Sequence, residues 1–135
     1  MTTFTATQPV TPVRRSGRAR AARIGLWTIR IVLAAQFAAG GVLKLSADPQ
    51  MVAMFEVLGD GQGLRLLVGL CEVAGAVGLL VPRLARLAAI GLVALMTGAA
   101  VTNIVALQTS PVLPLVLLAL AAVVVVATRR TRSAR

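Results

Sequence analysis

Four long apolar segments, separated by short polar connections, make up most of the chain. They cover residues 24–45, 63–81, 87–107 and 112–128. Each falls near the length of about 17–25 residues with which a helix crosses a hydrocarbon core of roughly 30 Å. Backbone groups in lipid must be hydrogen-bonded within the protein, which favours helices for such segments. The pattern therefore predicts an all-α fold, a bundle of four transmembrane helices.

The stretches outside these segments are polar. Residues 1–22 are rich in Thr, Pro and Arg without apolar periodicity, which predicts a disordered basic tail. Residues 129–135 form a second basic tail, so the expected transmembrane domain is 23–128. The connection 46–62 contains an apolar patch, which fits a short helix in the membrane interface or a loop that caps the bundle. We favour the loop, with a gate over a lateral entrance as an alternative role.

Composition supports a membrane location. Hydrophobic residues make up 58% of the chain, and the mean hydropathy is +0.89. The net charge of +10 would also suit nucleic acid, but the basic residues flank apolar segments and lack interleaved aromatic side chains. We therefore expect the lipid bilayer, and no nucleic acid, as a partner.

The distribution of charge predicts the topology. Of the 14 Lys and Arg residues, eleven lie in the N-terminal tail with the adjoining Arg23, the connection after residue 81 and the C-terminal tail. These three segments share one side of a four-span protein, whereas Asp48, Glu56 and Asp60 fall on the other side. The positive-inside rule then predicts that both termini are cytoplasmic. We expect a multi-pass protein of the cell membrane, and the Arg, Ala, Val and Gly bias favours a bacterial source.

Glu72 is the one acidic residue inside a predicted span. A charge near the bilayer midplane is costly, so this carboxylate needs a partner or a function. Arg30 and Lys44 share one face of the first span, and Arg65 precedes Glu72 on its own span. Each of the three has a side chain long enough to approach Glu72, so the sequence leaves the choice of cation open.

Two interpretations of Glu72 remain open. In the structural one, a buried ion pair fixes two helices in one register. In the functional one, Glu72 with Arg30 or Lys44 lines a polar cavity that binds a quinone, a lipid headgroup or a proton. Thr97, Thr102 and Asn103 on the third span would add hydrogen-bonding groups to such a cavity.

The sequence does not support a thiol-redox, metal-binding or catalytic function. The chain has no histidine and one cysteine, Cys71, so it cannot form an internal disulfide or a CxxC dithiol. We find no metal-ligand set and no nucleophile with an adjacent base, and we assign no catalytic residue. Cys71 is interpreted as a small packing residue. Stand-alone enzyme activity is therefore not expected.

Several motifs together resemble the DoxX and DoxX-like family over about residues 27–129. They are an arginine inside the first span, GGVLKL at 40–45, GLCEVAGAVGLLVP at 69–82 and MTGA at 96–99. The resemblance implies a four-helix bundle whose characteristic polar residues are Arg30, Lys44 and Glu72. Members often carry a histidine in the third helix where this chain has Asn103, a difference that argues against a proton- or metal-dependent role.

The resemblance also carries an expectation of function. The family takes its name from a subunit linked to thiosulfate:quinone oxidoreductase, and some relatives are implied in responses to oxidative or thiol stress. We therefore expect an accessory subunit of a redox-linked membrane complex, with a quinone as cofactor and a membrane or peripheral redox protein as partner. The alternatives are a small, homo-oligomeric transporter coupled to protons through Glu72, and an assembly factor or scaffold.

Overall fold

The computed structural model describes residues 15–59 and 61–133, and side chains within 17–130. Its elements are α1 (Arg15–Leu45), α2 (Pro49–Val57), α3 (Gly61–Leu80), α4 (Ala85–Val105) and α5 (Val112–Ser133), with no strand in these ranges. The helices α1, α3, α4 and α5 are each long and apolar enough to cross a membrane. The predicted all-α fold with four spans is therefore confirmed.

Two helices extend beyond the spans that the sequence predicted. Helix α1 begins at Arg15, so residues 15–22, expected in an irregular tail, are helical, and residues 1–14 lie outside the described part. Helix α5 likewise continues to Ser133, into the segment expected as a tail. Arg and Ala are strong helix formers, so a helix that is nucleated in the membrane propagates through them. The 31 residues of α1 span about 46 Å, more than a hydrocarbon core of roughly 30 Å.

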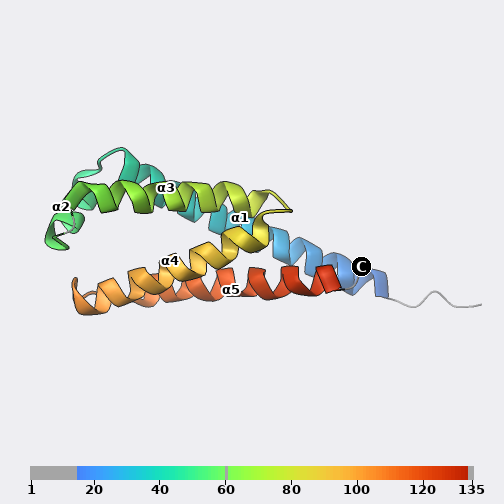
Figure 1. Cartoon of the computed structure of the whole chain (residues 1–135). Coiled ribbons are helices and arrows are strands. Elements are labelled where there is room, and N and C mark those ends of the chain that lie inside the picture. Colours follow the sequence, from blue (N-terminus) through green and yellow to red (C-terminus); the bar gives the residue numbers. More distant parts are fainter. Residues whose placement is uncertain (1–14, 60, 134–135) are drawn as a thin grey trace, which may run out of the picture.

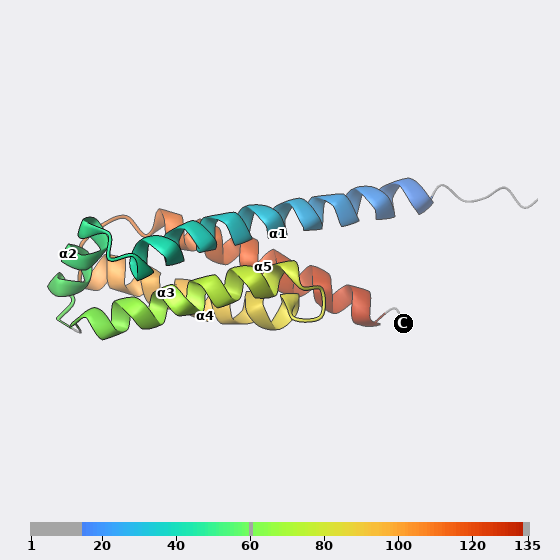
Figure 2. The same cartoon turned by 90° about the horizontal axis from the view of Figure 1, so that it is seen from above.

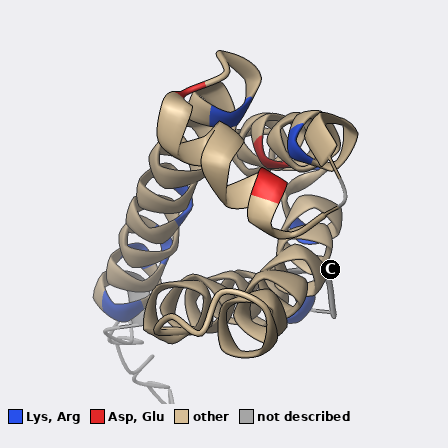
Figure 3. Cartoon of the chain, turned by 90° about the vertical axis from the view of Figure 1, so that its left-hand side faces the viewer, with Lys and Arg blue, Asp and Glu red and all other residues tan. Residues whose placement is uncertain are grey.

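The connection between the first two spans contains a short helix, the alternative that we did not favour, and the loop that we favoured is wrong. Asp48 is the N-cap of α2, and its carboxylate accepts hydrogen bonds from the backbone N–H groups of Gln50 and Met51 at 3.1 and 3.4 Å. Pro49 follows at the first helical position, where its missing N–H costs nothing. The helix buries Phe55 and lies across one end of the bundle (Figure 3).

The four spans form a closed ring, in which α1 contacts α3, α3 contacts α4, α4 contacts α5 and α5 contacts α1 (Figures 1 and 2). The largest fully buried side chains come from all four spans: Leu33, Leu79, Leu92 and Val124. Many large apolar side chains, among them Val77, Leu87 and Val105, are more than half exposed. An outer surface of this kind suits contact with lipid.

Glycines bring α1 and α3 into close contact. A Cβ atom on Gly41 would lie 2.7 Å from Cγ2 of Val73 and 2.9 Å from the carbonyl oxygen of Gly69. No side chain fits between the backbones at this crossing. Apolar burial does not drive helix association in lipid, so close backbone approach of this kind is a main source of attraction between spans. The contact also fixes the axial register of the charged residues that flank it.

Candidate functional site

Glu72 and Lys44 form an ion pair inside the bundle. The Lys44 Nζ atom lies 2.9 Å from Oε2 and 3.1 Å from Oε1 of Glu72, and 3.5 Å from the carbonyl oxygen of Gly40. The two side chains are 13% and 7% exposed. Gly40 makes room for the pair, because a Cβ atom there would lie 3.3 Å from Oε2 of Glu72. Among the three cations left open by the sequence, Lys44 is the one that contacts Glu72.

Arg30 has a different partner. Its Nε atom donates a 2.6 Å hydrogen bond to the carbonyl oxygen of Leu79, and its guanidinium lies 4.1 Å from the centre of the Trp27 ring. Leu79 is in the last turn of α3, where carbonyl groups lack helical partners and the helix dipole favours a cation. Leu79 lies seven residues beyond Glu72, about 10 Å along the helix. Arg30 therefore caps α3 at a different level from the ion pair.

Arg65 makes the corresponding contact at the opposite end. Its Nη1 atom donates to the carbonyl oxygen of Lys44 in the last turn of α1, and its Nε atom donates to Oε1 of Gln62 at 2.5 Å. The two antiparallel helices thus exchange arginines, each capping the C-terminal end of the other. Arg30 and Arg65 are only 4% and 6% exposed, so these caps are internal to the bundle.

The Lys44–Glu72 pair lies on the wall of a cavity of about 350 Å³. Helix α2 contributes Met54 and Phe55 to this cavity, its C-cap residue Leu58 also lines it, and the remaining lining of α3 is apolar. Helix α4 contributes mainly small and apolar residues together with Thr102 and Asn103. The result is an apolar chamber with one charged wall and a few neutral polar groups, which is the usual composition of a small-molecule site.

Of the three polar residues expected from the third span, Thr102 and Asn103 line this cavity and Thr97 does not. Asn103 has a second contact. Its Nδ2 atom also donates a 3.0 Å hydrogen bond to the carbonyl oxygen of Ser110, which ties α4 to the following turn. Thr97 is exposed, and its hydroxyl donates to the carbonyl oxygen of Val93 within the same helix. Arg30, Arg65 and Thr97 are thus outside the cavity lining, whereas Lys44, Glu72 and Asn103 belong to it.

From the sequence, no residue of the connection 46–62 was assigned to the site. The signal was present as the apolar patch in the connection, which we interpreted as a loop over the bundle. Met54 and the C-cap residue Leu58 lie four residues apart and so share one side of this short helix, and Phe55 next to Met54 also lines the cavity. That side closes the cavity beside Glu72.

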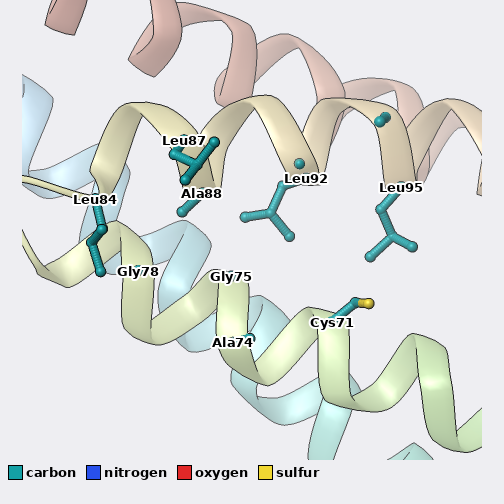
Figure 4. A pocket seen from close by; sticks show the side chains of 11 residues that line it. Cys71, Ala74, Gly75, Gly78, Leu84, Leu87, Ala88, Leu92 and Leu95 are labelled. Atoms are coloured by element: carbon teal, nitrogen blue, oxygen red, sulfur yellow. The ribbon is translucent and has the colours of Figure 1, made fainter.

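A second, almost wholly apolar cavity of about 530 Å³ lies between α3 and α4 (Figure 4). Small residues of both helices, including Gly75, Gly78 and Ala88, line this space, and Cys71 lies at one end of it. Ala94 and Leu95 line both cavities, so the two are neighbours along α4. An amphiphile with its polar end beside Glu72 has an adjacent apolar space for a chain.

A ring of four apolar spans that encloses an ion pair and a largely apolar cavity defines a small multi-pass membrane protein. The model of the DoxX-like family matches residues 28–125, and the chain belongs to this family. The resemblance noted in the sequence is therefore confirmed. No curated protein and no solved structure matches the chain.

Proposed function

We propose that this protein is an accessory membrane subunit of a redox-linked complex, and that the cavity beside Lys44 and Glu72 binds the headgroup of a quinone. The observation that carries the proposal is a single charged pair on the wall of an otherwise apolar cavity of about 350 Å³. Membership of the DoxX-like family supports the redox link, because the resemblance implies subunits associated with quinone-dependent oxidoreductases.

The cavity fits a quinone in size and chemistry. Its volume is at the lower end of the roughly 300–1,000 Å³ that small-molecule sites occupy, enough for a ring with short substituents. Met54, Phe55 and Met96 provide soft apolar walls for a ring. The adjacent apolar cavity between α3 and α4 suits the beginning of an isoprenoid tail.

The polar groups have separate tasks in this proposal. Lys44 Nζ makes a long 3.5 Å contact with the Gly40 carbonyl oxygen, so it can redirect that N–H toward a ligand carbonyl and keep its bonds to Glu72. Glu72 balances the ammonium charge and is the one group of the pair that can hold a proton on oxygen. A bound quinone supplies two-electron, two-proton redox chemistry.

A partner protein would supply the electrons. One cysteine cannot provide both the attacking and the resolving sulfur of a thiol oxidoreductase, and the sequence contains no histidine. This is the reason to propose an accessory subunit that binds and presents a quinone, and not a complete enzyme.

The test measures quinone retention in mild detergent by native mass spectrometry. Purified protein is loaded with ubiquinone or menaquinone, and the parent is compared with Glu72→Gln and with Gly98→Leu. Glu72→Gln removes the charge at nearly constant shape. Gly98 lines the cavity and has open space around a Cβ atom, so Gly98→Leu fills the cavity and leaves the pair intact. Thr97→Val is the control, because Thr97 is on the same helix outside the lining.

We expect both cavity variants to lose quinone retention by about tenfold or more, as expected for loss of a charge-assisted hydrogen bond or of the space, and the control to keep it. Equal retention in all four proteins would refute the quinone site.

The Glu72 variant and a deletion of the protein address the alternative functions. Proton-coupled flux in proteoliposomes that depends on Glu72 would favour a transporter, and loss of one partner protein on deletion without quinone binding would favour an assembly factor.

A further inference from the structure

The end of the bundle that carries the first residues of α1 contains a groove unrelated to the Glu72 cavity. It lies between α1 and α5 and has a volume of about 810 Å³. Its floor consists of alanines from both helices, with Leu26, Val123 and Val126 as the larger apolar residues. Arg23 of α1 and Arg130 of α5 line it as well. The groove therefore pairs an apolar floor with two cations from different helices.

The two arginines have no acidic residue near them. All four acidic residues of the chain lie between positions 48 and 72. Asp48 and Glu56 belong to the N-cap and body of α2 at the far end of the bundle, Asp60 lies outside the described residues, and Glu72 is paired with Lys44. Arg23 and Lys44 are 21 residues apart on one helix, roughly 31 Å. No acidic side chain of the described residues therefore neutralises Arg23 and Arg130.

We propose that this groove, defined by Arg23, Arg130 and the alanines between them, binds an anionic phospholipid of the bilayer. The phosphate would lie between the two guanidinium groups, which bind phosphate oxygens through paired N–H donors. An acyl chain would lie on the alanine floor, where small side chains leave room for it. Basic pockets between spans are a recognised form of site for such lipids.

The position of Trp27 supports this assignment. It lies one helical turn beyond Arg23 toward the middle of the span and is 36% exposed. Tryptophan prefers the membrane interface, so Arg23 lies at the level of lipid headgroups and not deep in the hydrocarbon.

A second copy of this chain is a poorer occupant of the groove. A two-fold interface through this face would bring two copies of Arg23 and Arg130 together, with no acidic residue to separate them. The four like charges would repel one another. An anionic lipid, in contrast, neutralises the charges of both arginines, and its acyl chain covers the apolar floor of the groove.

The test compares lipid selectivity of the full chain in nanodiscs or mild detergent. Phosphatidylglycerol and phosphatidylcholine with identical acyl chains are offered together, and the retained lipid is read by native mass spectrometry. We expect the parent to prefer phosphatidylglycerol, and Arg23→Gln/Arg130→Gln to lose about tenfold or more of that preference, given about 1 kcal/mol per basic residue near an anionic surface.

The matched control is Arg20→Gln/Arg129→Gln. These exposed arginines lie on the same helices at similar depth and outside the groove lining. The control variant removes two arginines as well, so it has the same net charge as the groove variant. The control should keep the preference of the parent. An equal loss in both double variants would overturn the proposal in favour of a diffuse basic surface, and so would a parent without preference.

A third variant changes the shape of the groove without changing its charges. Ala122→Leu extends the floor into the groove and keeps both arginines. It should reduce retention of the lipid and leave binding of inorganic phosphate unchanged. If Ala122→Leu retains the lipid like the parent, the groove is not the binding site. If inorganic phosphate displaces the lipid fully at millimolar concentration, the arginines recognise phosphate alone and the acyl contact is refuted.

Discussion

At the scale of single residues, the ion pair between Lys44 and Glu72 is the most consequential contact. Both charges are nearly excluded from solvent, and each is the other's closest opposite charge in the described part of the chain. Desolvation of two ions offsets much of their attraction, so the pair adds little net stability compared with two apolar residues. Removal of one partner is different, since the remaining charge is left buried without compensation.

We therefore predict that Glu72→Leu lowers the free energy of unfolding by about 3–5 kcal/mol, because it leaves the Lys44 ammonium unpaired in the bundle. The measurement is thermal or denaturant unfolding of the purified protein in detergent, followed by circular dichroism.

The double variant Lys44→Met/Glu72→Leu serves as the matched comparison. It removes both charges and keeps a similar volume, so it should recover most of the lost stability. A double variant as unstable as Glu72→Leu alone would show that the ion pair is not the source of the loss.

At the scale of helices, α1 and α3 form the best-defined pair. Their backbones meet at Gly41 and Gly69, and the capping arginines Arg30 and Arg65 lie on either side of this crossing. The glycine contact sets how far one helix can slide along the other. Lys44, one turn beyond Gly41, is thereby placed level with Glu72.

We predict that Gly41→Ala lowers stability by about 1–3 kcal/mol, because the added Cβ atom meets a backbone carbonyl oxygen at 2.9 Å as well as the Val73 side chain. Unfolding in detergent measures the change. The control is Gly25→Ala on the same helix, where a Cβ atom would have no neighbour within 4 Å. Alanine should be neutral or stabilising there, since it favours helix over glycine by up to about 1 kcal/mol. Equal losses at both positions would contradict the close crossing.

At the scale of the whole molecule, the charges divide the bundle into two ends. The end with α2 holds Asp48 and Glu56, whereas the other end holds the basic segments at the starts of α1 and α4 and the end of α5. The start of α1 at Arg15 and the end of α5 at Ser133 therefore both belong to the basic end. The positive-inside rule predicts that this end faces the cytoplasm.

We predict this orientation for labelling in intact cells. Single cysteines replace Thr109, in the turn between α4 and α5, and Arg83, between α3 and α4, in a Cys71→Ala background. Both positions are exposed and lie at opposite ends of the bundle. A membrane-impermeant maleimide should label Thr109→Cys in intact cells, and Arg83→Cys only after permeabilisation. The reverse pattern would overturn the orientation, and the Cys71→Ala parent controls for background.

The sequence by itself determined the number of spans, their approximate positions and the need of Glu72 for a cation. These properties depend on local hydropathy, on segment length and on the cost of a charge in lipid, all of which can be evaluated along the chain. It also showed the apolar patch between the first two spans, but not that the patch forms a capped helix, α2. The local N-cap signal of Asp48 followed by Pro49 was available and was overlooked.

Only the tertiary structure decided which cation pairs with Glu72. Arg30, Lys44 and Arg65 all have the reach, and rise per residue alone does not give the relative height of two helices. The contact between Gly41 and Gly69 fixes that height, places Arg30 at the end of α3 and leaves Lys44 beside Glu72. The cavity likewise required α2, α3 and α4 together, because a cavity is a property of several packed surfaces and not of any one segment.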